Sequence, residues 1–207
     1  MTAPAGTAAD PFSVLVLCTA NICRSPAGEA VLRALLGPTA DVTVVSAGLS
    51  ARVGEPLDPR MAAALDVPLP GFRARQVTPA MVAAADLVLT MTRDHRATLL
   101  GQVPTALRRT FTVRELAALA ALAAERGQVT GSSPAERLAS LAVAAPRLRS
   151  QRTPGADDDV EDPYGRASEA HLLAVQRIRE AMTVLAVVAG SASSATTAGG
   201  ADAPVPA

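Results

Sequence analysis

Large aromatic side chains are scarce in this chain. Phe, Tyr and Trp make up 2% of its 207 residues, whereas apolar residues of all kinds make up 49%. Much of that apolar fraction is alanine, so it overstates the large side-chain area that folding can bury. The length nevertheless suits one domain with some additional chain, since domains commonly run about 100–200 residues.

The chain also has no excess of charge of either sign. Lys plus Arg and Asp plus Glu each number 19, which gives a formal net charge of zero. Nucleic acids and anionic membrane surfaces attract proteins with a basic excess. We therefore expect neither a nucleic acid nor a membrane as a partner, and only a local basic pocket is compatible with this balance.

Targeting and membrane-spanning signals are lacking as well. Residues 1–12 contain neither a basic n-region nor an apolar h-region. The most apolar late stretch, residues 181–189, is far shorter than the roughly 20 residues of a spanning helix. These two absences predict a cytoplasmic protein.

Cysteine is nearly absent. The two present, Cys18 and Cys23, lie five positions apart, which is too few and too close for a disulfide framework. One reading is that both are small buried apolar side chains. A zinc site is not expected, because it needs about four ligands and neither His95 nor His171 lies near the cysteines in the sequence.

Short apolar runs alternate with helical patterns through the first half of the chain. Strands are predicted at residues 13–17, 42–45, 86–91 and 111–113. Helices are predicted at about residues 25–35, 58–65, 78–85 and 93–100. This alternation predicts an α/β fold with a parallel sheet. Ligands of such sheets bind beyond the carboxyl ends of the strands, where Cys18 and Ser46 lie.

After residue 114 the chain becomes rich in alanine and leucine. Helices are predicted at about 115–126, 134–145 and 168–188. The expected organisation is a disordered leader at 1–11, a domain at 12–189 that contains a helical and loop insertion at 113–158, and a disordered tail at 190–207. The leader and tail consist mostly of small residues and proline, which cannot bury a core.

The segment that follows the first predicted strand carries the chemistry. Cys18 is followed six positions later by Arg24, so five intervening residues can curl around one tetrahedral anion with the N–H groups of residues 19–24 pointing inward. The helix that starts near Ser25 directs its positive end at the same point, with the Ser25 hydroxyl as its expected cap and Glu29 in its first turn. Arg24 can offer a planar fork to two phosphate oxygens.

Cys18 is the candidate nucleophile of this loop. Helix N-termini and neighbouring cations stabilise thiolates, so Cys18 is expected to be ionised at neutral pH. The Ser25 hydroxyl is placed to donate a hydrogen bond to its sulfur. Asn21 tolerates the left-handed backbone that a tight loop needs, and its amide could tie the loop to Ser46.

A leaving alkoxide or phenolate needs a proton, and Asp162 is the candidate acid. Pro163 stiffens the loop after it, and Tyr164 could form one wall of a pocket for an aromatic leaving group. Because other acidic residues surround Asp162, it could instead be an ordinary loop acid, and Tyr164 could be a packing residue. No metal is required, since loop amides and Arg24 can stabilise the charge.

These motifs resemble the low-molecular-weight protein tyrosine phosphatases, and the chain resembles a bacterial member. The matching segments are residues 14–26, 46–48, 73–76, 85–91 and 162–165. The resemblance implies a four-stranded parallel sheet flanked by helices, as in a flavodoxin-like three-layer sandwich. It also implies Cys18 as nucleophile, Arg24 as phosphate ligand and Asp162 as general acid. The residues expected to bind substrate or support the loop are Thr19, Ala20, Asn21, Ile22, Cys23, Ser25, Ser46 and Tyr164.

Some positions depart from the pattern of that family. Ala20 stands where the family usually has Gly, Phe72 stands where many members have His, and residues 49–53 lack an aromatic that some members use as the opposite pocket wall. Cys23 is similar to the family's second loop cysteine, which can form a protective disulfide with Cys18.

The predicted function is cysteine-dependent hydrolysis of phosphomonoesters through a phosphocysteine intermediate, without a cofactor. The expected substrate is a phosphotyrosine protein or a small phosphomonoester. One alternative is an arsenate reductase on the same scaffold that uses an external thiol donor, because no cysteine follows Cys23. Another alternative is a phosphate-binding module without turnover. The sequence does not indicate the oligomeric state.

Overall fold

The computed structural model describes residues 10–38, 41–152 and 158–190. Most of the predicted leader, residues 1–11, and of the predicted tail, residues 190–207, lies outside these ranges. Within them, no helix is long and apolar enough to cross a membrane.

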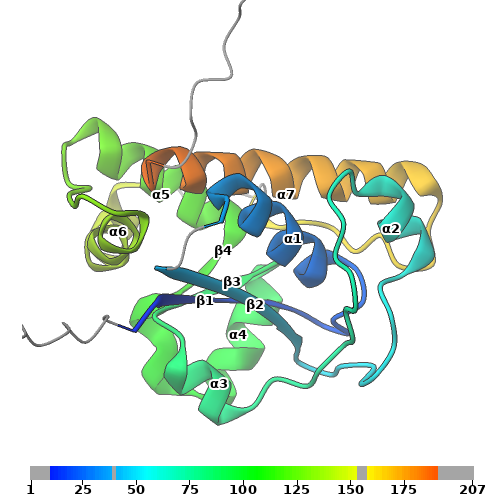
Figure 1. The fold of residues 1–207 in the computed structure, drawn as a ribbon. Helices are drawn as coiled ribbons and strands as arrows, with labels where there is room; N and C mark the ends of the chain where they lie inside the picture. Colours follow the sequence, from blue (N-terminus) through cyan, green and yellow to red (C-terminus); the bar gives the residue numbers. More distant parts are fainter. Residues whose placement is uncertain (1–9, 39–40, 153–157, 191–207) are drawn as a thin grey trace, which may run out of the picture.

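A four-stranded parallel sheet forms the centre of the structure (Figure 1). Its strands are β1 (Phe12–Cys18), β2 (Val42–Gly48), β3 (Leu87–Thr90) and β4 (Thr110–Thr112), in the order β2-β1-β3-β4. All pairings are parallel, and the register places Cys18 opposite Gly48, so the carboxyl ends of β1 and β2 lie at one edge. The predicted four-stranded parallel sheet is confirmed.

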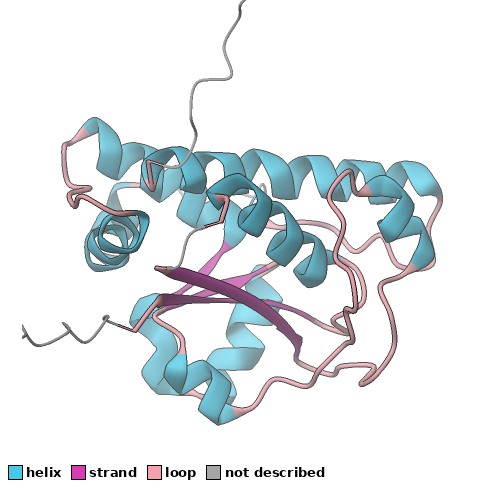
Figure 2. Ribbon diagram, viewed as in Figure 1, coloured by secondary structure: helices cyan, strands magenta, loops and turns pink. Residues whose placement is uncertain are grey.

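Helices cover both faces of the sheet, which gives the expected three layers (Figure 2). One face carries α1 (Arg24–Leu36), α2 (Pro59–Ala64), α5 (Val113–Glu125), α6 (Pro134–Leu148) and α7 (Ser168–Val188). The other face carries α3 (Pro79–Ala84) and α4 (Arg93–Gln102). Two short 3₁₀ helices are η1 (Pro104–Arg109) and η2 (Arg149–Gln151).

The residues of β1 alternate between two separate hydrophobic clusters. Val14 and Val16 belong to the cluster shared with α1, α5 and α7, whereas Leu15 and Leu17 belong to the cluster shared with α3 and α4. A strand that is buried on both faces is apolar at successive positions, as this one is. β1 is therefore a rigid support for Cys18 at its carboxyl end.

The helices begin in two different ways. Thr112 and Glu115 form a capping box at the start of α5. Cys23 is the N-cap residue of α1 and makes no side-chain capping bond. The expectation that Ser25 caps α1 is wrong, because the helix already begins one residue earlier and the Ser25 hydroxyl is bonded within the loop. Glu29, expected in the first turn, lies one turn further along and is buried.

Several element boundaries also differ from the prediction. β2 continues to Gly48, although residue 45 was its expected end. Val113 was expected to end the fourth strand, but it begins α5 because the capping box starts the helix there. α6 continues past Pro146 to Leu148, although residue 145 was its expected end. Ala145 and Leu148 are buried in the core, and their packing holds this last turn in place.

Candidate active site

The loop between β1 and α1 is shaped by Asn21. Its φ is 55°, and it is the one non-glycine with positive φ among the described residues. Asn and Asp adopt this conformation more readily than other side chains. Its amide nitrogen donates to the hydroxyls of Ser25 at 2.9 Å and Ser46 at 3.0 Å, and its oxygen accepts from the Arg75 backbone N–H at 2.9 Å. The expected tie from Asn21 to Ser46 is therefore present, and it joins the loop to the end of β2.

The Ser25 hydroxyl lies 3.0 Å from the Cys18 sulfur. It accepts the hydrogen bond from Asn21, and it can donate either to that sulfur or to the carbonyl of Ala47, 3.3 Å away. A hydroxyl has one hydrogen, so it can serve only one of these acceptors at a time. When Cys18 is a thiolate, the charged sulfur is the stronger acceptor, and the arrangement can then stabilise negative charge on it.

A buried carboxylate supports the loop from behind, and sequence reasoning missed this role of Glu29. Glu29 accepts a hydrogen bond from the Ser46 hydroxyl at 2.7 Å and lies 3.9 Å from the Arg75 guanidinium. Arg75 in turn donates to the Ser46 carbonyl at 2.7 Å. Buried carboxylates need such partners, so a glutamate among the apolar residues of a predicted helix was the available signal.

Arg24 joins the loop to a segment far along the chain. Its guanidinium pairs with the Asp162 carboxylate at 2.7 Å and donates to the Val160 carbonyl at 3.0 Å. The Arg24 side chain is 5% exposed, and among the described residues its Nε has no hydrogen-bond partner. Buried donors are normally satisfied, and a phosphate oxygen is a partner that a guanidinium fork binds well.

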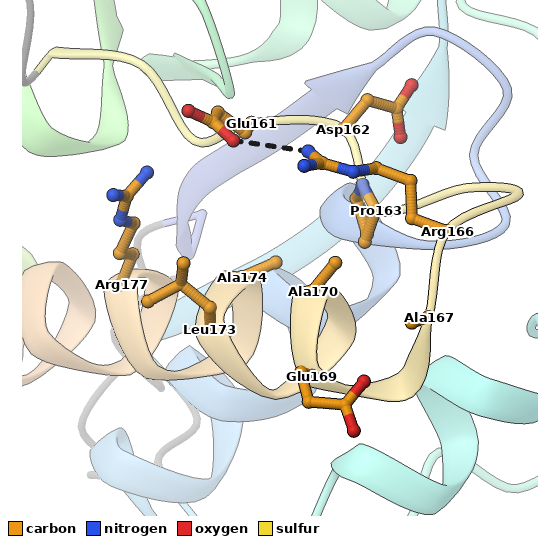
Figure 3. A pocket seen from close by; sticks show the side chains of 10 residues that line it. All are labelled: Glu161, Asp162, Pro163, Arg166, Ala167, Glu169, Ala170, Leu173, Ala174 and Arg177. Atoms are coloured by element: carbon orange, nitrogen blue, oxygen red, sulfur yellow. Dashed lines mark hydrogen bonds and ion pairs between the residues drawn. The ribbon is translucent and has the colours of Figure 1, made fainter.

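Asp162 lies on a loop that runs beside the first turns of α7 (Figure 3). Its side chain is 51% exposed, and its second oxygen accepts a hydrogen bond from the Tyr164 backbone N–H at 3.2 Å. An ion pair between Glu161 and Arg166 at 3.2 Å closes the loop, and Arg60 of α2 donates to the Arg166 carbonyl at 2.8 Å. The loop thus presents an accessible carboxylate to the Cys18 loop.

Tyr164 and Arg52 face each other at the mouth of a cavity of about 270 Å³. The Arg52 guanidinium lies 4.9 Å from the centre of the Tyr164 ring, a cation–π distance. The cavity is lined by Cys18, Thr19, Ala20, Ile22, Cys23, Arg24, Ser50, Arg52, Asp162 and Tyr164. Tyr164 is 46% exposed, so the reading of this residue as core packing is wrong. Sequence reasoning noted the missing aromatic at 49–53 but did not identify Arg52.

Both histidines contact the loop region in space. The His95 Nε2 lies 2.8 Å from the Thr19 hydroxyl. Burial, followed by the charge of Arg24, lowers the pKa of His95 to about 4.

His171 is fully buried, and one of its ring nitrogens lies within 4.8 Å of the Cys23 sulfur. The argument against a zinc site assumed that neither histidine lies near the cysteines, and for His171 that assumption is wrong. Sequence separation could not show that α7 returns to the start of α1.

The predicted site residues therefore form one constellation. The cavity brings together the candidate nucleophile, phosphate ligand and acid, and Asn21, Ser25 and Ser46 hold the loop from outside the cavity lining. The sequence profile of a known family, described as "Low molecular weight phosphotyrosine protein phosphatase", matches residues 13–125.

The chain belongs to this family. The resemblance to the low-molecular-weight phosphatases is thus confirmed at the level of the family. The family match contains Cys18, Arg24 and Ser46 and extends through α5, but it ends before Asp162. The role of Asp162 thus rests on its contact with Arg24.

Two curated relatives illustrate the similarity. The chain is 32% identical over 142 residues to the probable low-molecular-weight protein-tyrosine-phosphatase EpsP of Ralstonia nicotianae, covering 66% of this chain and 96% of the relative. It is 39% identical over 94 residues to the phosphatase Wzb of Salmonella typhi, covering 44% of this chain. That second match spans only 61% of the Wzb length, so the substrates of Wzb do not transfer directly.

Solved structures of the family share the fold. Wzb of Escherichia coli K30, in complex with sulphate, has a TM-score of 0.60 and 26% identity, covering 85% of this chain and 96% of that chain. The YwlE arginine phosphatase of Geobacillus stearothermophilus has a TM-score of 0.62 and 25% identity, covering 86% and 92%. Enzymes named for two different phosphorylated residues are therefore similar to this chain, and the fold alone does not fix the substrate.

Proposed function

We propose that the protein hydrolyses protein phosphotyrosine through a phosphocysteine formed on Cys18. The observation that supports this proposal is the convergence of three groups on one cavity. The Cys18 sulfur lies 3.0 Å from the Ser25 hydroxyl, and the Arg24 guanidinium pairs with Asp162 at 2.7 Å. A nucleophile, a phosphate clamp and an acid in mutual reach are what phosphoryl transfer to cysteine requires.

In the first step the Cys18 thiolate attacks phosphorus. A phosphorus–sulfur bond forms while the bond to the tyrosine oxygen breaks, and the loop N–H groups of residues 19–24 together with Arg24 balance the charge on the phosphoryl oxygens. The dianion that binds Arg24 competes with Asp162 for the guanidinium. The carboxylate released from Arg24 takes up a proton from the solvent as the substrate binds, and it delivers this proton to the leaving phenolate oxygen.

In the second step water hydrolyses the phosphocysteine. The Asp162 carboxylate, deprotonated in the first step, accepts a proton from a water molecule that attacks phosphorus. The phosphorus–sulfur bond breaks, inorganic phosphate forms, and Cys18 leaves as a thiolate. The Ser25 hydroxyl, 3.0 Å from the sulfur, stabilises this leaving group by turning its hydrogen away from Ala47.

The mouth of the cavity favours phosphotyrosine over phosphoarginine. The Arg52 guanidinium lies over the Tyr164 ring, 4.9 Å from its centre, and a phenyl ring that enters the cavity can contact the edge of this stacked pair. A phosphoarginine brings a guanidino group, which would meet the positive charge of Arg52. Because some similar structures are arginine phosphatases, phosphoarginine is the second substrate to test.

The decisive test is the hydrolysis of para-nitrophenyl phosphate by freshly reduced protein. We expect turnover that survives EDTA, disappears in Cys18→Ser and falls about 10²- to 10⁴-fold in Asp162→Ala. Glu169→Ala removes an exposed carboxylate in the first turn of α7 and is the matched control, with an expected change below about threefold. Burst kinetics should show the phosphocysteine as a fast first phase.

The opposite results are equally clear. If reduced, folded protein does not release nitrophenol, the phosphatase proposal fails, and arsenate reduction with an added thiol becomes the next assay. If a phosphoarginine peptide has a higher kcat/KM than the matching phosphotyrosine peptide, the phosphotyrosine assignment fails while the phosphocysteine chemistry stands.

A further inference from the structure

Three side chains from distant parts of the chain meet beside the Cys18 loop. Cys23 is the N-cap residue of α1, Asp58 is the N-cap residue of α2, and His171 lies in the first turn of α7. Each side chain contributes one possible ligand atom, and these three atoms lie within 4.8 Å of one another. They are the Cys23 sulfur, an Asp58 oxygen and a His171 nitrogen. The proposed phosphatase chemistry does not use the side chains of this cluster.

His171 is oriented as a ligand would be. Its side chain is 0% exposed, and its Nδ1 lies 3.1 Å from the carbonyl of Ala167. A carbonyl only accepts hydrogen bonds, so Nδ1 carries a hydrogen and the lone pair of a neutral ring is on Nε2. Metal-binding histidines commonly donate their second N–H to a backbone carbonyl in this way.

The Nε2 atom of His171 faces negative charge without a hydrogen bond. Among the described residues it has no hydrogen-bond partner, although the Asp58 carboxylate lies 3.5 Å away. A nitrogen lone pair and a carboxylate oxygen repel each other unless a cation or a proton lies between them. A buried polar atom without a partner calls for an explanation, and a bound cation also accounts for the carboxylate that faces this nitrogen.

Cys23 brings a buried sulfur to this cluster, since the residue is 4% exposed and its sulfur lies within 4.8 Å of the ligand atoms of Asp58 and His171. A divalent cation bound there would take the sulfur as a thiolate, because metal ligation deprotonates a thiol. Sulfur, imidazole nitrogen and carboxylate oxygen together select zinc-class ions over magnesium or calcium.

We propose that Cys23, Asp58 and His171 form a binding site for a zinc-class divalent cation. Tetrahedral zinc holds its ligands at about 2.0–2.3 Å, which places the ligand atoms roughly 3.3–3.8 Å from one another. The His171 and Asp58 atoms, 3.5 Å apart, already fit, and the Cys23 sulfur need move by no more than roughly 1–1.5 Å. Asp58 is partly exposed, which provides a route for the ion and a place for water as the fourth ligand. The bound ion cross-links the Cys18 loop, α2 and α7, and it therefore stabilises the folded protein.

Cobalt(II) absorption is the direct measurement. Metal-free protein, kept reduced with a phosphine rather than a thiol, is titrated with cobalt(II), and zinc(II) is then added to displace it. We expect a thiolate-to-cobalt charge-transfer band and tetrahedral visible bands in the wild type. Zinc at about a hundred times its Kd should raise Tm by roughly 5–10 °C.

Variants separate this site from the nucleophile. Cys18→Ser should keep the cobalt bands and the zinc-induced rise in Tm, whereas Cys23→Ser and His171→Gln should lose both. His171→Cys should recover cobalt binding with a stronger charge-transfer band, because it adds a second thiolate. Metal-free Tm values of all variants establish that each one folds.

Two outcomes would overturn the site. In the first, the cobalt bands disappear in Cys18→Ser and persist in His171→Gln, which would place the ion on the nucleophile. In the second, neither cobalt nor zinc binds the reduced wild type, and His171 and Asp58 are then an imidazolium–carboxylate pair. Neither outcome would contradict the proposed phosphatase activity on which the reading of the loop rests. That activity is tested separately, by turnover in the presence of EDTA, which removes the metal ion.

Discussion

Arg52 is the single residue whose charge bears most directly on substrate choice. It lies over the Tyr164 ring at the mouth of the cavity and also pairs with Glu55 at 3.4 Å. Its guanidinium is held by contacts outside the catalytic loop, so it can be changed without disturbing Cys18 or Arg24. We therefore expect a substitution of Arg52 to affect substrate recognition separately from the proposed chemistry.

Replacing Arg52 should change recognition rather than chemistry. In Arg52→Ala the KM for a phosphotyrosine peptide should rise about two- to fivefold with kcat nearly unchanged, because a cation–π contact contributes about 0.5–1 kcal/mol at exposed sites. The same variant should lose less with a phosphoarginine peptide, which gains by removal of the positive charge. Steady-state kinetics on both peptides measure this.

The control for Arg52 is Glu55→Gln, which removes the ion pair and keeps the guanidinium over Tyr164. A KM in Glu55→Gln close to that of the wild type would assign the effect to the ring contact. A fall in kcat of the same size as the rise in KM for Arg52→Ala would contradict the separation of recognition from chemistry.

Single-residue reasoning from the sequence worked where the relevant groups are close along the chain. The spacing from Cys18 to Arg24 and the need for a left-handed residue at Asn21 are local constraints, and the structure agrees with both. The buried position of Glu29 and the place of His171 beside Cys23 depend on how helices pack. For Glu29 the one local signal was its place among the apolar residues of a predicted helix. No local pattern indicates that His171 lies beside Cys23, so the sequence could not predict that contact.

At the scale of elements, α1 packs closely between the sheet and α7 at Gly28. A Cβ built on Gly28 would lie 3.0 Å from a methyl of Val16 in β1, 3.1 Å from the Met91 side chain and 3.2 Å from the Met182 side chain of α7. These distances are shorter than ordinary van der Waals contact. The missing side chain thus lets α1, and with it Arg24 at the start of the helix, lie close to the sheet.

A larger residue at this position should separate the layers. Gly28→Val should destabilise the protein by about 1–3 kcal/mol, the usual cost of overpacking a core. Gly101→Ala is the matched control, since Gly101 lies in α4 with nothing within 4 Å of a built Cβ, and it should stabilise by up to about 1 kcal/mol. Urea denaturation measures both, and a stable Gly28→Val would show that the layers can move apart freely.

The helices and strands with a clear hydrophobic pattern in the sequence were the ones that could be predicted. The apolar runs of β1, β2 and β3 and the long amphipathic α7 were predicted close to their observed bounds. The start of α5 was not, because Val113 favours a strand by propensity while the capping box makes it helical. We keep the proposal that residues 113–158 form an insertion, although α5 lies within the family match.

At the scale of the whole molecule, the layers bring the first strand and the last helix of the described residues to one site. α7, the last helix, contacts α1, α2 and α5, and the loop before it carries Asp162 to the carboxyl edge of the sheet. α4, on the opposite face, brings His95 to Thr19 from the other side. We propose that residues 12–189 act as one catalytic unit, because the site has contributions from both faces of the sheet.

Because His95 is buried in this unit, its titration affects the stability of the whole fold. Burial, followed by the charge of Arg24, lowers the pKa of His95 from 6.5 to about 4. Between about pH 4 and 6.5 the unfolded chain therefore binds more protons at this residue than the folded protein does, so the free energy of unfolding rises with pH in that window. The stabilisation from neutral His95 is complete above about pH 6.5 and is lost as the pH falls toward 4.

Comparison of the wild type with His95→Gln isolates this effect. Glutamine can still contact Thr19 but does not titrate, so the variant should show a shallower pH dependence of unfolding free energy, by up to about 1.4 kcal/mol per pH unit. Urea denaturation in EDTA at several pH values between about 4 and 7.5 gives both curves, and the carboxylates titrate in both proteins. Parallel curves would mean that His95 accepts its proton as readily folded as unfolded, and the contact between α4 and the loop would then be open to water.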